Sequence, residues 1–207
     1  TADERLARGI YGEDLITKRI DCARSAHVVQ LINSTYSKQY LGLGEAGGGE
    51  RAARMCWDLI EATGADAVIS YKEVIGQLTP RLREKGIRFA HFGALVGLNA
   101  LQDCKRPLII GRPEAAPLAV EAMARALNLD SPEPLNLTGN YERVLRCYEL
   151  ADGSRPGVLV SVHPDALVQA VVSSIREGER IQALDRVRTV RPAQTGKTVS
   201  IACNVTI

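Results

Sequence analysis

The stretch Gly64-Ala65-Asp66-Ala67-Val68-Ile69-Ser70 decides how this chain is expected to fold. Its apolar run, Ala65–Ser70, is short and bounded by a glycine, which is typical of a strand buried inside a sheet. The preceding residues, Arg51–Thr63, place apolar side chains on one helical stripe, and Gly64 is a suitable C-cap for that helix. The stretch therefore predicts a helix that delivers the chain into a buried strand.

The residues that follow repeat this alternation of strand and helix. Ser70 and Glu73 have the spacing of a capping box, which predicts a helix from this point to about Lys85, ended by Gly86. Further strands are expected at Ile87–Phe92 and Pro107–Gly111, and a further helix at Ala115–Leu127. This order is the βαβ rhythm of an α/β fold, a parallel sheet with helices on both faces.

The N-terminal part carries weaker signals. Residues 1–12 are polar and basic without a clear period and are interpreted as a terminal arm. Leu15–Ile20 is expected to form a strand, and Ala26–Ile32 has apolar residues at helical spacing.

The C-terminal part changes in pattern. Glu142–Leu150 and Gly157–Val162 are strand-like, and Asp152-Gly153 between them is a hairpin signal. We expect residues 142–162 to form an antiparallel hairpin at the edge of the parallel sheet. Three further elements are predicted: a helix from Asp165 that breaks at Gly178, a short helix at Glu179–Val187, and a final strand at Lys197–Ile207.

Composition bounds the class of protein. A chain of 207 residues is most simply one domain over residues 1–207, and 45% hydrophobic with 24% charged residues is ordinary for a globular protein. The net charge of +2 means that any nucleic-acid surface has to be local. Five scattered cysteines without a CxxC pair argue against a zinc site or a disulfide framework, so no metal site is expected.

The same evidence on cysteines favours a reducing, cytoplasmic setting. There is no run of 18 apolar residues and no apolar core of a signal peptide, so neither a membrane partner nor secretion is expected. The chain begins on Thr1 rather than Met, and we expect it to be a piece of something longer.

Two separated runs carry a family resemblance. His91-Phe92-Gly93-Ala94-Leu95-Val96-Gly97-Leu98-Asn99 and Gln182-Ala183-Leu184-Asp185-Arg186-Val187-Arg188 resemble the last two motifs of the second RecA-like lobe in superfamily-two helicases. The version they are similar to is that of phage- and plasmid-type replication helicases, some of which also carry a primase segment. Shorter matches at Ser25–Gln30, Thr35–Lys38 and Leu108–Pro113 extend the resemblance over most of the chain.

The resemblance implies roles for individual residues. Gln182, Arg186 and Arg188 would be catalytic, with one arginine acting as a finger on the transferred γ-phosphoryl group of ATP, a role that needs a planar donor fork. Gly97 and Asn99 would also bind the nucleotide. Lys72, His91 and Gly93 would bind the nucleic acid. Arg188 can share the task with Arg186 only if the helix has ended before it, because on a continued helix it projects to another side.

Two departures from the family pattern stand in these runs. The family's arginine in the first run is Val96 here, and the glycine before the first arginine of the second run is Asp185. An alternative reading of the arginine-rich run is a solvated helix face laced with salt bridges.

No phosphate loop is expected in this chain. Gly47-Gly48-Gly49 is followed by Glu50-Arg51 rather than by Gly-Lys-Ser/Thr, and Gly196-Lys197-Thr198 lacks the earlier glycine that the motif requires. The resemblance therefore implies that ATP and Mg²⁺ are bound mainly by an N-terminal RecA-like lobe of the same protein, with DNA as the second partner.

Two other functions remain open from the sequence. One is a doubly wound enzyme or ligand-binding domain that uses the carboxyl ends of its strands for a small molecule. The other is an interaction module that kept a RecA-like fold and lost the activity, which Val96 and Asp185 favour.

Overall fold

The fold is described from a computed structural model, for residues 4–12, 14–18, 25–128, 133–147, 149, 153–189 and 196–204. The chain divides into two compact units. The first comprises Thr1–Ile20, Glu114–Gly178 and Thr206–Ile207, and the second comprises Asp21–Pro113 and Glu179–Val205. Each unit is described by itself below, and the expectation of one domain over residues 1–207 stays a prediction.

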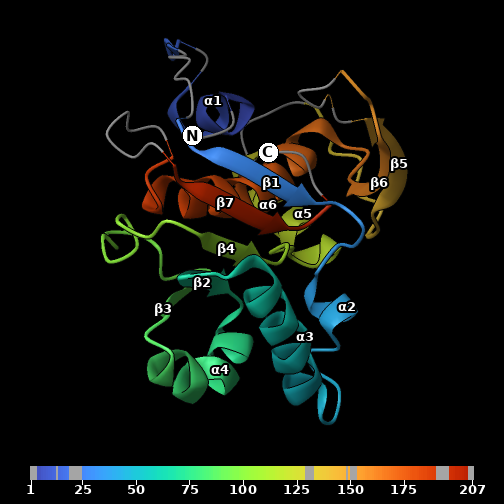
Figure 1. The fold of residues 1–207 in the computed structure, drawn as a ribbon. Helices are drawn as coiled ribbons and strands as arrows, with labels where there is room; N and C mark the ends of the chain where they lie inside the picture. Colours follow the sequence, from blue (N-terminus) through green and yellow to red (C-terminus); the bar gives the residue numbers. More distant parts are fainter. Residues whose placement is uncertain are drawn as a thin grey trace. The chain divides into compact units, whose positions relative to one another are not determined.

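The second unit is built on a five-stranded sheet in which all neighbours are parallel. Figure 1 shows its strands in the order β1 (His27–Leu31), β7 (Thr198–Ala202), β4 (Pro107–Ile110), β2 (Ala67–Ser70) and β3 (Arg88–His91). All four residues of β2 and of β4 are buried, as expected for central strands covered on both faces. The predicted α/β class with a RecA-like parallel sheet is confirmed.

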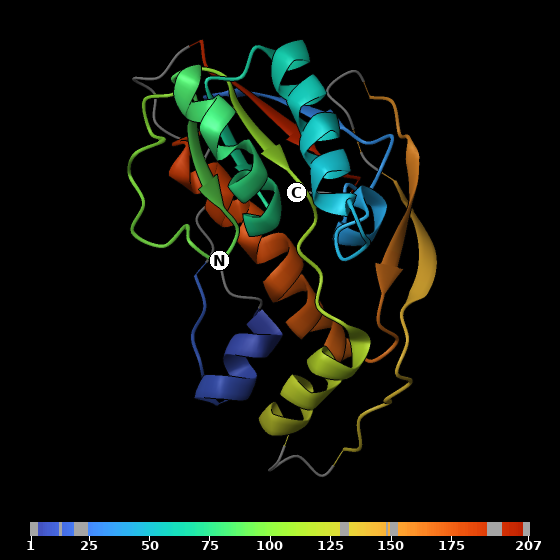
Figure 2. The same cartoon turned by 90° about the horizontal axis from the view of Figure 1, so that it is seen from below.

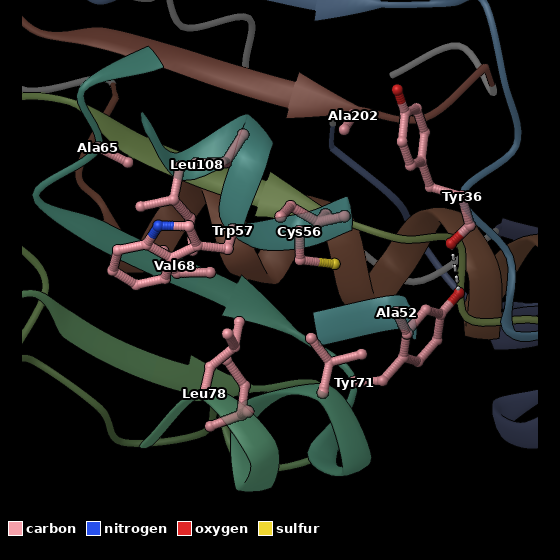
Figure 3. Packing of buried hydrophobic residues seen from close by; sticks show 14 of the residues in the cluster. Tyr36, Ala52, Cys56, Trp57, Ala65, Val68, Tyr71, Leu78, Leu108 and Ala202 are labelled. Carbon is pink, nitrogen blue, oxygen red and sulfur yellow. Dashed lines mark hydrogen bonds between the residues drawn. The ribbon is translucent and has the colours of Figure 1, made fainter. Parts of the chain in front are cut away.

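Helices α3 (Gly48–Thr63) and α4 (Lys72–Glu84) cover one face of this sheet, with the short α2 (Lys38–Leu41) beside α3. Side chains alternate along a strand, so Val68, Leu108 and Ile110 point to this face and pack in one core with the apolar stripes of the helices. Figure 3 shows this packing around Cys56 and Trp57 of α3.

The other face carries the alternate residues Ile69, Ile109 and Ile201, all fully buried. The last turns of α6 (Ala166–Arg186), from Glu179 onward, lie on this face (Figure 2). Ala183 and Leu184 in these turns are buried. Helices therefore lie on both faces of the sheet, as predicted.

The first unit contains α1 (Glu4–Tyr11), α5 (Pro117–Leu127), the first part of α6, and a two-stranded antiparallel sheet of β5 (Glu142–Cys147) and β6 (Gly157–Val162). Its apolar core joins α5 to α6 through Val120, Ala124, Val168, Val171 and Val172. The carboxylate of Asp165 caps α6, because its Oδ1 accepts from the backbone N–H of Leu167 at 2.9 Å and of Val168 at 3.0 Å.

Charged side chains are also buried in the first unit. Arg176 of α6 donates to Oε1 of Glu114 at 3.3 Å, to Oε1 of Glu177 at 2.7 Å and to the carbonyl oxygen of Ser161 at 2.7 Å. The imidazole of His163 accepts the backbone N–H of Asp165 at Nδ1, 3.1 Å away.

The same imidazole binds a carboxylate with its other nitrogen. Its Nε2 lies 3.0 Å from Oε1 of Glu121, which also accepts the backbone N–H of Gly139 at 2.6 Å. Since Nδ1 is occupied as an acceptor, the proton of His163 sits on Nε2 and points at Glu121.

Several local expectations were wrong. Residues 4–11 of the expected arm form helix α1, stabilised by the Glu4–Arg8 pair one turn apart, while residues 15–18 of the first expected strand are not in a strand. Ala26–Ile32 does not form a helix: it contains β1, which pairs with β7. Residues 1–3, 19 and 20 lie outside the described part.

Ser70 does not cap α4. It is the last residue of β2 and fully buried, and α4 begins after Tyr71 without a side-chain cap. The predicted break at Gly178 is also absent, since α6 runs unbroken from Ala166 to Arg186.

The hairpin over residues 142–162 is confirmed as antiparallel but does not belong to the parallel sheet, because β5 and β6 form a sheet of their own. Its turn residues 150–152, and residues 205–207 of the final expected strand, lie outside the described part.

None of the helices in the described ranges combines the length and apolar character needed to cross a bilayer.

Candidate functional site

The two runs that carry the family resemblance lie against each other in the second unit. The backbone N–H of Gly93 donates to Oε2 of Glu179 at 3.0 Å, and Nη2 of Arg188 donates to Oδ1 of Asn99 at 3.1 Å. Residues 86 and 89 positions apart in the sequence are therefore in direct contact. The fold brings the predicted glycine-rich loop and the predicted arginine-bearing helix end into one site.

The loop leaves β3 at His91 and returns to the start of β4. Leu95 is fully buried and anchors it, whereas Val96, at the position of the family's arginine, is 82% exposed. Gly93 and Gly97 have φ of 81° and 76°, in the left-handed region that favours glycine. No heavy atom lies within 4 Å of a Cβ built on either residue, so the space beside the backbone is open and glycine is favoured by the backbone conformation alone.

The helix end carries its polar residues on one stripe. Glu179, Gln182 and Arg186 are three and four positions apart, which places them on the same side of α6 as the contact with Gly93. Gln182 and Arg186 are half-buried, and Nε of Arg186 is buried without a hydrogen-bond partner in the described part of the chain. Arg186 thus holds a donor in the protein that no described acceptor uses.

The helix ends before the second arginine. Residues 187–189 form a turn, and Arg188 has φ of 58°, which turns its side chain away from the helical path toward Asn99. The carbonyl of Val187 accepts a hydrogen bond from Nζ of Lys197, which also donates to the carbonyl of Gln102 at 2.7 Å. The condition for Arg188 to share a site with Arg186, an earlier end of the helix, is met.

Lys197, in the run that was compared with a phosphate loop, is buried in the protein. Lys197 belongs to the Gly-Lys-Thr run and is 1% exposed, with both contacts going to backbone carbonyls of its own unit. Burial lowers the pKa of its ammonium group below the ordinary value. Its place in the core accounts for this lysine without a phosphate.

The remaining predicted residues lie at the carboxyl ends of two neighbouring strands. His91 ends β3 and is the register partner of Ser70 in β2, while Lys72 opens α4 two residues later. Lys72 is exposed, and Nδ1 of His91 lies 2.8 Å from the carbonyl oxygen of Phe92. Lys72, His91 and Gly93 therefore share one edge of the sheet, whereas Asn99 and Arg188 meet where the loop has turned back toward β4.

Sequence reasoning missed Tyr71, which ties the strand ends together. Its hydroxyl donates to the carbonyl of Tyr36 at 3.2 Å, a contact drawn in Figure 3, and accepts the backbone N–H of Arg112 at 2.8 Å. A Cβ on Gly111 would lie 2.7 Å from the Tyr71 ring, so glycine is required beside it. Only the position of a tyrosine directly after a buried strand was visible in the sequence.

One ion pair lies near this edge, between Lys38 and Glu73. Nζ of Lys38 lies 2.7 Å from Oε1 of Glu73, and this hydrogen bond lowers the pKa of the Glu73 carboxyl group below its ordinary value. Among the described residues, no three His, Cys, Asp or Glu side chains gather closely enough to hold a metal ion.

Comparisons with known proteins found no match for this chain. No family model matches it, and neither the curated proteins nor the solved structures contain a match.

Proposed function

We propose that this chain is the second RecA-like lobe of an ATP-dependent DNA helicase of the phage or plasmid replication type. The observation that supports the proposal is the contact of the His91–Asn99 loop with the arginine-bearing end of α6. Residues far apart in the sequence that resemble two motifs of one catalytic site also meet in space. The proposal holds for a cytoplasmic protein, in line with the cysteine usage.

The residues present fit only part of an ATP site. The Gly-Lys-Thr run at residues 196–198 lacks the earlier glycine of a phosphate loop, and Lys197 is buried against backbone carbonyls. The described part of the chain also has no cluster of metal ligands. When bound, ATP would supply the phosphoryl group, and another RecA-like lobe would hold the phosphates and Mg²⁺. This chain would add donors for the charge that develops on the transferred group.

Arg186 is the arginine that we assign to this task. Its Nε has no described partner, whereas the guanidinium group of Arg188 is already bonded to Asn99. Arg188 would then hold the loop against the helix, and Glu179 would fix the start of the loop through Gly93. Gln182, on the same stripe as Arg186, would meet the nucleotide from the same side.

The decisive experiment measures ATP turnover in the protein that also contains the phosphate-loop lobe. An arginine finger is worth about 10³ to 10⁵ in rate, so Arg186→Ala is expected to lower turnover by that order. Arg186→Lys should rescue little, because lysine lacks the planar fork. Arg83→Ala, a change at an exposed arginine of α4, is the matched control and should keep full turnover.

Unchanged turnover in Arg186→Ala would contradict the assignment. If Arg188→Ala lowered ATP turnover more than Arg186→Ala, the arginine finger would be Arg188. A melting temperature that collapses in Arg186→Ala would mark a structural residue, because the described part of the chain gives its Nε no hydrogen bond that the substitution would remove.

DNA binding is expected at the carboxyl ends of β2 and β3. With a net charge of +2 the binding should be weak, salt-sensitive and indifferent to sequence. Fluorescence anisotropy with labelled single-stranded DNA should show weaker binding for Lys72→Ala and no change for Lys85→Ala, an exposed lysine at the opposite end of α4. Equal binding by both variants would place the DNA surface elsewhere.

A small-molecule site at the same edge is the second candidate. It is favoured by Ser70, which is fully buried with a hydroxyl that has no described hydrogen-bond partner, next to the Tyr71 links between strand ends. Ligands of open α/β sheets bind outside the carboxyl ends of the strands.

Calorimetry separates the two candidates. The isolated chain should bind neither Mg-ATP nor another nucleotide at micromolar concentration if it is a helicase lobe. Micromolar binding of a small metabolite, abolished by Tyr71→Phe, would favour the second candidate.

A further inference from the structure

The two-stranded sheet of the first unit presents an open edge. Within the described residues β5 pairs with β6 alone, and every residue of β5 except Val144 is exposed. The outer edge of such a strand carries backbone N–H and C=O groups that are ready to pair with another strand. A strand pair without further support is only marginally stable in water, so added strands stabilise it.

The exposed face of this sheet is apolar next to that edge. Leu145 of β5 and Leu159 of β6 are register partners, and they are 68% and 54% exposed. On the opposite face, Val158, Val160 and Val162 are buried. A strand added to β5 would extend the sheet and cover the flank of Leu145.

The charged side chains along β5 indicate which kind of strand could pair with its open edge. Glu142 and Arg146 stand two residues before and two residues after Val144, on the same face of the strand. When two copies of β5 pair antiparallel about a two-fold axis at Val144, each Glu142 lies opposite the Arg146 of the second copy. Moving the axis by one residue, to Arg143 or Leu145, loses both ion pairs.

We propose that β5 is a self-association edge and that its partner is a second copy of this chain. The product is a four-stranded antiparallel sheet in the order β6, β5, β5, β6, with an isologous two-fold interface. Opposite charges across the interface select this register, and unmatched strands are disfavoured at the same positions. An edge of six residues makes a small interface, so the dimer is weak and forms at high protein concentration.

Charge reversal tests the pairing directly. Sedimentation equilibrium should show a dimer for the unchanged chain, and an association constant about tenfold or more lower for both Glu142→Arg and Arg146→Glu. Each variant places like charges opposite each other in its own dimer. The double variant E142R/R146E should recover dimer formation, and so should an equimolar mixture of the two single variants, because both restore opposite pairs.

Arg143→Glu is the matched control, a change of the same size on the same strand. In the proposed register Arg143 faces Leu145 of the second copy, so the association constant should stay within about twofold. All of these side chains are exposed, and circular dichroism should show an unchanged fold.

Cross-linking fixes the register. In a Cys147→Ser background, which removes the exposed thiol of β5, Val144→Cys should form a disulfide-linked dimer under mild oxidation, because the two Cα atoms at the axis lie within disulfide range. Leu159→Cys in the same background is the control, since β6 lies on the outer side of the paired sheet.

Three outcomes would overturn the proposal. These are a chain that remains monomeric at millimolar concentration, a dimer that neither charge reversal weakens, and equal cross-linking by Val144→Cys and Leu159→Cys. None of them bears on ATP turnover, which is tested with Arg186.

Discussion

Two buried cations, Arg176 of the first unit and Lys197 of the second, are compensated in different ways. In the first unit, buried Arg176 is matched by the carboxylates of Glu114 and Glu177. In the second unit, the buried ammonium group of Lys197 is bonded to two backbone carbonyls. The pairing of Arg176 depends on ionised carboxylates. The pairing of Lys197 depends on main-chain carbonyl groups, which do not titrate.

The difference has a consequence for where stability resides. A carboxylate that loses its buried cation becomes an uncompensated charge, whereas a carbonyl that loses its donor is only an unsatisfied dipole. We therefore expect the first unit to be more sensitive to the loss of a single charge than the second. Trp57, the only tryptophan, reports on the second unit, and hydrogen exchange measured peptide by peptide reports on the first.

The largest effect is expected for Arg176→Met. It keeps most of the side-chain volume but leaves the carboxylates of Glu114 and Glu177 without their cation, at a cost of about 3 kcal/mol or more in the free energy of unfolding. Urea denaturation followed by hydrogen exchange in α5 and α6 measures it. Arg155→Met, which removes an exposed pair with Glu149, should cost less than about 1 kcal/mol. Equal costs would remove the distinction between buried and exposed pairs in this unit.

A smaller loss is expected for Lys197→Met in the second unit. The carbonyls of Val187 and Gln102 lose their donor, at a cost of about 1–3 kcal/mol, but no charge is left unpaired. Trp57 fluorescence in urea follows this change, with Lys105→Met at an exposed position as the control. A cost above that of Arg176→Met would reverse the comparison of the two units.

Next in size is Asp165→Ala, which removes the cap of α6 in the first unit. Loss of the bonds to Leu167 and Val168 should cost about 1–2 kcal/mol. Asp165→Asn keeps an acceptor oxygen and should cost clearly less. If both variants unfold at the same urea concentration as the unchanged chain, the cap does not contribute to stability.

Gly178→Ala should stabilise the protein by about 0.5–1 kcal/mol, because glycine inside a helix is less favourable than alanine. No heavy atom lies within 4 Å of the added Cβ, so no clash offsets the gain. Thermal unfolding measures the shift. A lower melting temperature would indicate that α6 needs the freedom of glycine at this position.

The smallest effect is expected from mild acid. The N–H of Gly139 lowers the pKa of Glu121 below its ordinary 4.5, and His163 adds to this. For Asp165 burial alone would raise the pKa, but the N–H groups of Val168, Asn136 and Leu167 outweigh it and hold the pKa below the ordinary 3.8.

The lowered pKa values of Glu121 and Asp165 determine how stability changes with pH. The unfolded chain binds protons first as the pH falls, so the contribution of both carboxylates is present above their ordinary pKa and is lost as the pH falls through the lowered folded values. Between pH 6 and 5 the first unit should therefore change little, and below about pH 4 its hydrogen-exchange protection should fall before Trp57 responds. Glu73 in the second unit also has a lowered pKa, but its pair with Lys38 is half exposed and screened by water. A response of Trp57 at higher pH than the first unit would contradict this order.

The sequence by itself determined the elements whose signals are local. The apolar run that ends in Ser70, the stripe of α3 with Gly64 behind it, and the hairpin of β5 and β6 need only neighbouring residues to be recognised. The same holds for the end of α6 near Arg186, and for the candidate residues of the site, which were chosen by their resemblance.

Tertiary structure decided the elements whose partners are distant. Residues 27–31 form a strand because β7, from the other end of the chain, supplies the backbone partners that a short segment cannot find locally. Packing likewise carries α6 through Gly178, where the local cost of glycine is only about 1 kcal/mol. The contacts of Gly93 with Glu179 and of Asn99 with Arg188 have the same origin: a parallel sheet joins strands through long connections, so its folding alone determines which loop meets which helix.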